Sequence, residues 1–411
     1  METIPLKIAM LSVHSCPVGE LGTKDTGGMS VYIRELAREL GKRGHWVDIY
    51  TRIHDPKDRI IIEPGENARL IHLKAGDNGD MNKLAIYPYL ADFAFALENF
   101  RKRDGHYYDV VHSHYWLSGR VGGWVKDLWG VPHVVMFHTL GKVKNAVGVG
   151  EDEPSLRLVT ENEVINRCHR IIAATEREKL DLMRYYGALP ETIGVVPCGV
   201  NLELFKPIDR KDARRQLHLE QEKNIILHVG RIDPLKGIDR LLTAIAYLKS
   251  RTGFKLIIIG GNDHFHPELQ RLKWLSRDLG VQDLVMFAGR VPQEELPLYY
   301  NAADVSVVPS YHESFGLVAL ESLACGTPVV ATKVGGLENI IEEGQNGYLV
   351  TNDVPHSMAD KIELLLSKPD AGANSPRSIR DSVTKYSWSN IADALIEEYK
   401  ILYENRVAQV A

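Results

Sequence analysis

Two basic residues in the second half of the chain have a spacing that suits a diphosphate. Arg231 and Lys236 lie five residues apart, directly after the apolar run 225–229, which is predicted to be a strand. Two cations on one loop at the carboxyl end of a strand can clamp a diphosphate and stabilise the charge that develops as it leaves. The alternative is two solvated charges on a turn that contains Pro234. The position at the strand end favours the binding role.

A second group of residues follows the predicted strand 305–308. Ser314 is predicted to be the N-cap of a helix that runs to about Ala324 and stops at Gly326. The free amides near Gly316 and Leu317 would then form an anion site at the helix N-terminus.

Glu313 and Glu321 frame this segment, and their spacing limits the chemistry that they could do. Eight residues of helix span about 12 Å, which exceeds the ~5–9.5 Å between the two carboxyl groups of a glycosidase. We therefore expect two separate hydrogen-bonding roles, one to the hydroxyls of a donor sugar and one to a ribose. The alternative is that Glu321 is only a charged residue on the surface of the helix. Because the helix is otherwise apolar, this alternative is not favoured.

Two further features lie in the first half of the chain. Gly27 and Gly28 directly precede a predicted helix over 29–40, whose N-terminal amides could approach an anion closely. Their spacing fits neither GxGxxG nor a Walker loop, so the nicotinamide and P-loop interpretations lose support. His138 follows the predicted strand 133–137 and is expected to point into a cleft. The alternative is a core histidine bonded to backbone.

The sequence contains no clear set of metal ligands. His112 and His114 have an HxH spacing, but no third ligand occurs at a sensible spacing. No Asp-x-Asp motif occurs, so a divalent cation bridging a nucleotide diphosphate has no obvious anchor. We therefore predict no metal and no cofactor, and expect Arg231 and Lys236 to neutralise the diphosphate instead.

The elements that must position these residues alternate between strand and helix, once before and once after about residue 200. Several apolar runs are β-branched on both faces, as in parallel sheets covered by helices on each side. The pattern breaks at 201–210, which predicts a crossover between domains. The predicted strands are 8–13, 46–50, 110–111, 133–137, 170–174 and 193–196, then 225–229, 255–259, 285–287, 305–308, 328–331 and 348–350.

We therefore predict an α/β protein with two doubly wound, Rossmann-like domains, residues 1–203 and 204–386, that face one another across a cleft. Ligands in such sheets bind beyond the carboxyl ends of the strands, so the cleft should collect the residues above. A last helix within 387–411 is expected to return to the first domain, because Ile391, Leu395 and Tyr399 share one face with Leu402.

The composition of the 411 residues excludes several classes of protein. The chain is 44% hydrophobic and 25% charged, which excludes a disordered or fibrous protein. Its formal charge of -5 does not suggest a nucleic-acid binder. No apolar run approaches the ~18 residues of a membrane span, and the stretch 8–13 is too short for a signal-peptide core. Four scattered cysteines without a CxxC pair fit a reducing cytoplasm.

Together these features resemble the retaining glycosyltransferases of family 4, which have the GT-B fold. The resemblance covers essentially the whole chain and rests on Gly27-Gly28, His138, Arg231 with Lys236, Glu313 with Glu321, and the segment 326–332. The segments 25–32, 47–52 and 112–119 look like those of the mycothiol-pathway N-acetylglucosaminyltransferases that use inositol phosphate. Sucrose-phosphate synthases share much of the same pattern.

The resemblance implies that the second domain holds a nucleotide-sugar, which we take to be a UDP-sugar. The implied donor contacts are Arg231 and Lys236 on the diphosphate, Gly27 and Gly28 beside it, Glu321 on the ribose, Arg290 and Val291 near the base, and Glu313, Phe315, Gly316, Leu317 and His138 around the sugar. In such families the acceptor hydroxyl attacks from the leaving-group face, and a donor phosphate oxygen takes its proton. No protein nucleophile is required.

The resemblance also implies a phosphate pocket for the acceptor. Lys83, Tyr115, Thr139 and Arg157 occupy the matching places, and Lys83 and Arg157 would otherwise be unexplained cations in the cleft. The family's Gly-Gly-Met-Asn reads Gly-Gly-Met-Ser here, so the shorter Ser30 lies beside the expected acceptor. The acceptor is therefore expected to be a small phosphorylated compound, an inositol phosphate or a sugar phosphate.

Other functions stay open. One is transfer from UDP-glucose to fructose 6-phosphate, as in sucrose-phosphate synthases. The fold also carries phosphorylases and UDP-sugar epimerases, which the pattern of Glu313 and Glu321 disfavours, and a catalytically silent sugar-nucleotide binder ranks last. We expect the nucleotide-sugar and the phosphorylated acceptor as partners, no nucleic acid and a cytoplasmic location, and the sequence leaves a homodimer open.

Overall fold

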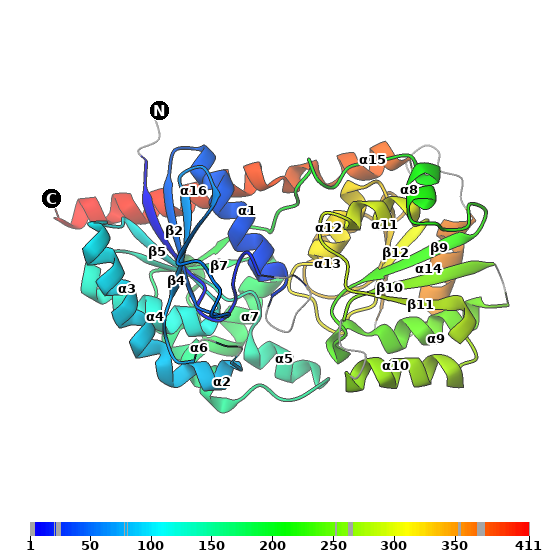
Figure 1. The fold of residues 1–411 in the computed structure, drawn as a ribbon, viewed down its shortest axis with the longest axis horizontal. Helices are drawn as coiled ribbons and strands as arrows, with labels where there is room; N and C mark the ends of the chain where they lie inside the picture. The colour runs from blue at the N-terminus through cyan, green and yellow to red at the C-terminus, as the bar shows by residue number, and fades with distance from the viewer. Residues whose placement is uncertain are drawn as a thin grey trace.

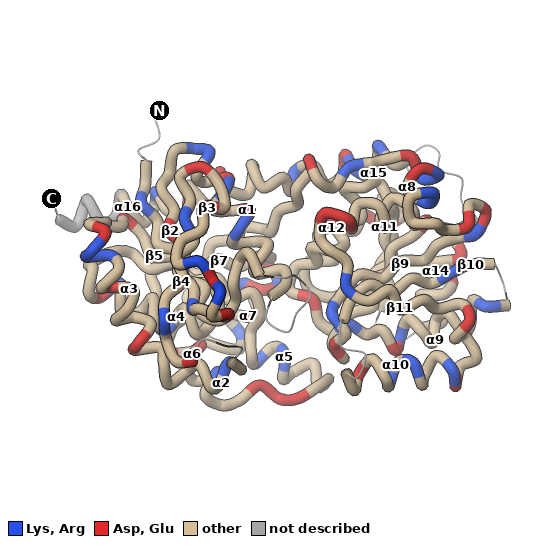
Figure 2. The backbone as a smooth tube through the Cα atoms, viewed as in Figure 1, with Lys and Arg blue, Asp and Glu red and all other residues tan. Residues whose placement is uncertain are grey.

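The computed structural model describes residues 5–410, apart from residues 20, 22–25, 78, 80, 251–252, 262–265, 352–354 and 368–374. Asp25, in the segment 25–32, therefore lies outside the described residues. The chain forms two lobes side by side, each with a central sheet between helices, and α16 (Trp388–Val410) returns along the first lobe (Figure 1). Charged residues of both signs are scattered over both lobes (Figure 2).

The first lobe contains an eight-stranded sheet with the order β3-β4-β2-β1-β5-β6-β7-β8. All neighbouring strands are parallel except β3 and β4. The strands are β1 (Lys7–Leu11), β2 (Trp46–Arg52), β3 (Ile61–Gly65), β4 (Ala68–Leu73), β5 (Val110–His114), β6 (His133–Met136), β7 (Arg170–Ala173) and β8 (Ile193–Val195). The helices are α1 (Gly28–Lys42), α2 (Lys83–Ile86), α3 (Leu90–Asp104), α4 (Tyr115–Trp129), α5 (Gly141–Val147), α6 (Ser155–Arg167) and α7 (Glu176–Tyr186).

The second lobe contains a six-stranded parallel sheet with the order β11-β10-β9-β12-β13-β14. The strands are β9 (Asn224–Val229), β10 (Phe254–Ile259), β11 (Val285–Gly289), β12 (Val305–Val308), β13 (Val329–Thr332) and β14 (Gly347–Val350). The helices are α8 (Arg210–Gln216), α9 (Ile238–Leu248), α10 (Pro267–Asp278), α11 (Leu296–Ala302), α12 (Leu317–Ala324), α13 (Leu337–Ile340), α14 (Pro355–Leu366) and α15 (Pro376–Asp381).

The predicted class, two doubly wound sheets with a returning helix, is confirmed. The antiparallel pair β3 and β4 is the one part of the two sheets that the sequence did not predict. β3 lies at the edge of the sheet, is only partly buried and contains Pro64 and Gly65. A short edge strand with such residues gives neither a continuous apolar run nor a clean alternation. The predicted domain limits at residues 203 and 386 stay predictions.

The order of the strands explains which loops meet. β9 pairs with β12, so the loops that follow Val229 and Val308 are neighbours at the carboxyl edge of the second sheet. β5 lies between β1 and β6, so the segments after Leu11, His114 and Met136 are neighbours in the first. Residues far apart in the sequence are thereby collected at two facing edges.

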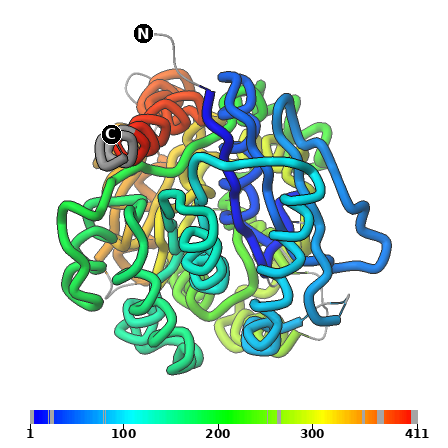
Figure 3. The backbone as a smooth tube through the Cα atoms, turned by 90° about the vertical axis from the view of Figure 1, so that its left-hand side faces the viewer, coloured from blue at the N-terminus to red at the C-terminus, as the bar shows by residue number. Residues whose placement is uncertain are grey.

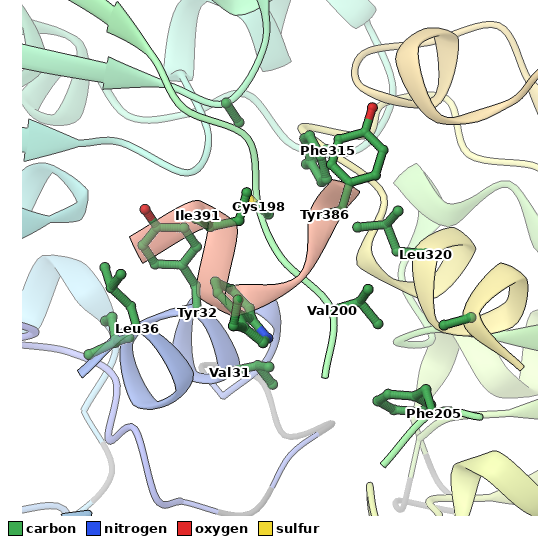
Figure 4. Packing of buried hydrophobic residues seen from close by; sticks show 14 of the residues in the cluster. Val31, Tyr32, Leu36, Cys198, Val200, Phe205, Phe315, Leu320, Tyr386 and Ile391 are labelled. Atoms are coloured by element: carbon green, nitrogen blue, oxygen red, sulfur yellow. The ribbon is translucent and has the colours of Figure 1, made fainter. Parts of the chain in front are cut away.

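The two lobes share one hydrophobic cluster. It joins α1 to the crossover and to the second lobe, through Val31 and Tyr32, then Val200 and Phe205, then Leu320 and others (Figure 4). α16 completes the connection, because Tyr399 donates to or accepts from Nδ1 of His112 at 2.6 Å. The turned view shows α16, in red, packed beside the first lobe (Figure 3). The predicted apolar face of this helix is therefore the face that returns to the first lobe.

Candidate active site

The N-termini of two helices from different lobes meet at the cleft. Gly28 begins α1, and a Cβ atom on it would lie 3.1 Å from Cδ1 of Leu317, the first residue of α12. A Cβ on Gly27 would meet nothing within 4 Å, so the backbone beside it borders open space. Helix N-termini carry amides without intrahelical partners and partial positive charge. The contact therefore directs two sets of free amides toward one place, as an anion requires.

The start of α12 differs from the prediction. The N-cap is Gly316, not Ser314, and it makes no side-chain capping bond. Ser314 instead accepts the Gly336 amide through its carbonyl oxygen, which holds it in the loop before the helix. Gly316 has φ +104°, and a Cβ there would lie 2.7 Å from Cδ2 of Leu337, so only glycine fits. The predicted end at Ala324 is correct, with Gly326 at φ +82° beyond it.

Lys236 and Glu313 form an ion pair between the two neighbouring loops of the second sheet. Nζ of Lys236 lies 2.6 Å from Oε2 of Glu313, and Ser310 donates to the same oxygen at 3.3 Å. Burial acts to raise the pKa of Glu313, but the ammonium of Lys236 outweighs it and holds that pKa below its ordinary value. Glu313 is therefore ionised and paired with the ammonium of Lys236.

Arg231 lies on the same loop as Lys236 but is more open to solvent. Its side chain is 44% exposed, against 22% for Lys236, and Nη2 lies 3.4 Å from Oδ2 of Asp233. The structure thus brings Lys236 to Glu313, and it leaves the more exposed guanidinium of Arg231 beside Asp233. Both cations remain on the loop that follows β9, where the sequence predicted them.

Glu321 lies within α12 and is buried. Tyr300 donates its hydroxyl to Oε2 of Glu321 at 2.9 Å. This bond and the side chain of Gln293 act to lower the pKa of Glu321, but burial outweighs them and raises that pKa to about 7. Arg290 and Val291 lie on the loop after β11, three and two residues before Gln293. Gln293 was not predicted from the sequence, because a lone glutamine in a loop carries no motif.

His138 occupies the carboxyl edge of the first sheet, just after β6, in a left-handed backbone conformation with φ +60°. Its Nε2 lies 3.0 Å from Nδ1 of His114, and the ring of Tyr32 packs edge-on against it. Burial lowers the pKa of His138 to about 3, so the ring is neutral at ordinary pH. Such a φ is unusual for histidine, and the surrounding contacts must hold it.

The four residues expected to hold an acceptor phosphate gather beside His138. Nη2 of Arg157 donates to the carbonyl and the hydroxyl of Thr139, at 2.8 and 3.0 Å. The guanidinium of Arg157 lies 4.8 Å from the ring centre of Tyr115, and Nζ of Lys83 lies 6.0 Å from the same centre. Lys83 comes from α2, Tyr115 begins α4, and Arg157 is in α6. Tertiary structure alone brings them together.

Arg157 is not an unexplained cation, which corrects one argument from the sequence. Its side chain is 1% exposed and pairs with Oε2 of Glu153 at 2.9 Å and Oε1 of Glu161 at 2.7 Å. The i, i+4 spacing on α6 and the turn before it makes both pairs possible. The positive charge of Arg157 is therefore already balanced within the protein.

His14, which the sequence analysis missed, completes this group. Its ring centre lies 4.5 Å from that of Tyr115, and its Nδ1 is buried without a hydrogen-bond partner among the described residues. Burial first, and then the charge of Lys83, lower its pKa well below the ordinary value. Its position just beyond β1 was the available signal. Ser30, at the position of the family's asparagine, is buried with its hydroxyl 2.7 Å from that of Ser15.

A cavity connects the two sides of the site. Its lining includes Thr139 and Glu178 of the first lobe, and His312, Glu313 and Gly335 of the second. Burial raises the pKa of Glu178 to about 7. The site is therefore a space shared between the lobes, with contributions from both sheet edges.

Within the described part of the chain, one group of three side chains has metal-ligand spacing: Asp48, Asp104 and His106. Arg69 already pairs with both carboxylates, at 2.8 and 2.7 Å, so this is an ion-pair cluster away from the cleft residues. His112 and His114 are not part of it. None of the described helices combines the length and the apolar character that crossing a membrane requires.

Comparisons with known proteins show the family and the fold of this chain. Residues 26–204 match the family described as Glycosyltransferase Family 4, and residues 209–385 match Glycosyl transferases group 1. D-inositol 3-phosphate glycosyltransferase 2 of Catenulispora acidiphila is 40% identical over 97% of this chain and 96% of its own length. The D-inositol 3-phosphate glycosyltransferase of Corynebacterium glutamicum is 37% identical, over 96% of both chains. Sucrose-phosphate synthase of Thermosynechococcus elongatus superposes with a TM-score of 0.90 and 33% identity, over 97% of this chain and all of that one.

Two parallel-sheet domains that share a cleft, together with these matches, define a glycosyltransferase of the GT-B fold. The predicted resemblance is confirmed. The chain belongs to glycosyltransferase family 4.

Proposed function

We propose that this glycosyltransferase moves a hexose from a UDP-sugar to a small phosphorylated acceptor, with retention of anomeric configuration and without a metal ion. One observation carries the proposal. Glu313, the ion-pair partner of Lys236, lies four residues before α12, whose N-terminus meets the N-terminus of α1 from the other lobe. This arrangement brings the free amides of two helices and the ammonium of Lys236 to the place where a diphosphate would leave.

The donor roles follow from this arrangement. Lys236, with Arg231, neutralises the departing diphosphate, and the α1 amides at Gly28 approach it from the other lobe. Glu313 accepts from sugar hydroxyls while the amides at Gly316 and Leu317 hold the same ring. Glu321 accepts from the ribose hydroxyls, with Arg290 and Val291 near the base. His138, which is neutral, hydrogen-bonds the sugar from the first lobe.

The chemical step needs no protein nucleophile. The bond between the anomeric carbon and the donor phosphate oxygen breaks, and the charge that it leaves is held by Lys236, Arg231 and the helix amides. The acceptor hydroxyl bonds to the same face of the oxocarbenium-like carbon, and its proton passes to a phosphate oxygen of the leaving UDP. The products are the glycosylated acceptor and UDP, with retained configuration.

The acceptor phosphate is proposed to bind at Lys83, Tyr115 and Thr139, with Arg157 holding Thr139 in place. The relatives named D-inositol 3-phosphate glycosyltransferase, up to 40% identical among those above, favour an inositol phosphate. A second candidate is fructose 6-phosphate, favoured by the TM-score of 0.90 to a sucrose-phosphate synthase and by Ser30 at the asparagine position. Both acceptors place a phosphate in the same pocket.

A nucleotide-release assay tests the proposal. UDP- and GDP-sugars are each incubated with inositol phosphates, fructose 6-phosphate and glycerate phosphates, in the presence of a chelator. We expect release of UDP with one phosphorylated acceptor, and a product whose anomeric proton coupling equals that of the donor. Turnover that stops with chelator, or an inverted product, contradicts the corresponding part of the proposal.

The phosphate pocket has its own test. Lys83→Ala is expected to raise the acceptor KM about tenfold or more, because a charge-assisted contact to phosphate is lost. Lys74→Ala, at an exposed lysine of the same lobe, is the matched control and should leave KM unchanged. Equal activity on the dephosphorylated acceptor would rule the pocket out.

A further inference from the structure

A pair of histidines connects two neighbouring strand ends of the first lobe. β5 pairs with β6 so that His114 lies opposite Met136, which places His138 just beyond the strand beside His114. Nδ1 of His114 and Nε2 of His138 are 3.0 Å apart, which is a hydrogen bond. His114 is fully buried, whereas His138 is half-buried. The bond therefore occupies Nε2 of His138 and leaves Nδ1 as the ring nitrogen that can contact a ligand.

The ring of His114 is held by three elements of the fold. His112 and His114 are two residues apart on β5, so both rings lie on one face of the sheet, with their centres 4.3 Å apart. The hydroxyl of Tyr399, on α16, is hydrogen-bonded to Nδ1 of His112 at 2.6 Å. The ring of Tyr32, on α1, packs edge-on against His114. The HxH spacing of the sequence therefore places two histidines side by side beneath α1 and α16.

The proton of the bond between His114 and His138 has two alternative positions. Both rings are neutral at ordinary pH, because burial lowers the pKa of each. A neutral imidazole carries one proton, on one of its two nitrogens. In the first arrangement, His114 donates from Nδ1, and His138 carries its own proton on Nδ1. In the second arrangement, His138 donates from Nε2, and His114 carries its own proton on Nε2.

The surroundings of Nε2 of His114 favour the first arrangement. This atom is buried and has no hydrogen-bond partner among the described residues. In the second arrangement it would be a buried N–H without an acceptor, and contact between an N–H and an aromatic ring such as that of Tyr32 is weaker than a hydrogen bond. Buried backbone N–H groups without an acceptor are rarer than carbonyls with a free lone pair, and the same cost applies to a ring N–H. His114 is therefore the donor.

We propose that His114 is a positioning residue that fixes the tautomer of His138, so that His138 presents an N–H donor, and not a bare acceptor nitrogen, to the transferred sugar. This inference rests on the proposed function, which places the sugar at His138. The hydrogen bond of one ring nitrogen sets which nitrogen of a histidine carries the proton. The sugar oxygen that His138 contacts then acts as the acceptor and needs no proton of its own for this bond.

The first experiment is a long-range ¹H–¹⁵N NMR spectrum of the full, ligand-free chain labelled with ¹⁵N-histidine. This spectrum separates ring nitrogens that carry a proton from those that do not, and His138→Gln identifies the signals of His138 among those of the 16 histidines. We expect a protonated Nδ1 and a bare Nε2 for His138 in the wild type. In His114→Leu no donor holds the proton on Nδ1, so the Nε2 signal of His138 should move toward the position of a protonated nitrogen.

Tyr399→Phe is the matched control. It removes a hydrogen bond from the neighbouring His112 and leaves the bond between His114 and His138 intact. The tautomer of His138 should therefore stay that of the wild type. His114→Asn tests rescue, because its side-chain amide offers an N–H at the same distance from the backbone as Nδ1 of histidine. We expect it to restore the wild-type signals of His138.

The second experiment measures release of UDP from UDP-glucose and from UDP-N-acetylglucosamine with the phosphorylated acceptors named above. His114→Leu should lower kcat/KM by about three- to tenfold, the value of one hydrogen bond, and His114→Asn should recover most of the loss. In a His138→Phe background, His114→Leu should cause no further loss, because His114 acts through His138. A merely structural role of His114 would cause the same loss in both backgrounds.

The outcomes are distinct. A wild type in which Nε2 of His138 carries the proton overturns the proposal, whatever the enzyme transfers. A loss from His114→Leu that persists in the His138→Phe background overturns the positioning role. A wild type with the expected tautomer that releases no UDP overturns the proposed function, and with it the role toward the sugar, but not the tautomer. If His114→Leu does not fold, the wild-type spectrum decides, because it needs no variant at position 114.

Discussion

The two halves of the site hold their charged groups in different ways. In the C-terminal half, which comprises Arg231, Lys236, Glu313, Glu321 and the amides of α12, the basic groups lie on one loop and remain partly exposed. In the N-terminal half, which comprises Lys83, Tyr115, Thr139 and Arg157, the guanidinium of Arg157 is sealed from water and neutralised by two glutamates. Basic groups are paired with carboxylates in both halves, but Arg231 and Lys236 keep part of their surface open to a ligand, whereas Arg157 does not.

This contrast predicts different consequences for substitutions of the same kind. A cation that is partly exposed contributes little to the stability of the fold, so its loss should lower the reaction rate rather than the stability. A buried cation between two carboxylates cannot be removed without leaving those carboxylates desolvated and unpaired. Substitution of a cation in the C-terminal half should therefore lower mainly kcat, and substitution of Arg157 in the N-terminal half should lower mainly the free energy of unfolding.

Lys236→Ala should produce the largest change. The ammonium stabilises charge on the leaving diphosphate, and loss of one such group lowers kcat by about a hundred- to a thousandfold. The circular dichroism spectrum should stay that of the wild type. Lys249→Ala, at an exposed lysine on the same lobe, should leave kcat unchanged. Near-normal transfer by Lys236→Ala would refute the assignment of charge stabilisation to this residue.

A pair of arginine variants measures the contrast between the halves directly. Arg157→Met should lower the free energy of unfolding by about 3–5 kcal/mol, because Glu153 and Glu161 lose their common partner. Arg231→Met, at the exposed position, should change it by no more than about 0.5 kcal/mol while lowering turnover. Urea unfolding followed by fluorescence gives both values. Equal free energies of unfolding for the two variants would contradict a structural role for Arg157 that Arg231 lacks.

The two glutamates of α12 and its preceding loop should show opposite pH dependence, with the smallest effects. Glu321 has a pKa raised to about 7, so the folded state holds its proton more tightly than the unfolded state does. Its contribution to stability is complete below the ordinary pKa of glutamate and is lost as pH rises through 7. Glu313 has a lowered pKa, so its contribution is present above the ordinary value and is lost as pH falls.

Thermal melts of the ligand-free protein at several pH values test this. The difference in stability between Glu321→Gln and wild type should shift in favour of the variant by about 2 kcal/mol from pH 5 to pH 8. Glu313→Gln should instead become relatively less stable as pH rises from 3 to 6. Parallel pH curves for wild type and both variants would show that the two carboxyl groups do not differ in their surroundings.

The strands of both sheets could be predicted wherever burial on both faces produces a continuous apolar run. All six strands of the second sheet and six of the first were identified in this way. β3 escaped because an edge strand need not be apolar on both faces and because Pro64 and Gly65 interrupt its pattern. β4 lies inside the sheet and is mostly buried, but Arg69 and His72 interrupt its apolar run. The start of α12 was misplaced by two residues, since the turn at 335–336 binds Ser314 through backbone, which no capping preference reveals.

The site residues also differ in how far they could be predicted from local sequence. Lys236 and Glu313 could be identified because each lies in a short segment where strand end, loop and helix start follow one another. His14 and Gln293 could not, because each is a single polar residue whose neighbours come from other parts of the chain. Arg157 was located but its surroundings were not, since its partners across the loop, Thr139 and Tyr115, are set by the order of strands in the sheet.

Sequence alone determined the class of fold, the local motifs and the family, because hydrophobic periodicity and the spacing of residues within one loop are properties of neighbours along the chain. Tertiary structure decided which charged side chains are buried in ion pairs and which stay partly exposed to a ligand. It also decided that Arg34 of the first lobe reaches Gln293 of the second. Burial and hydrogen bonding between distant segments determine whether a charged group is neutralised, and those arise only when the two sheets and their helices are packed together.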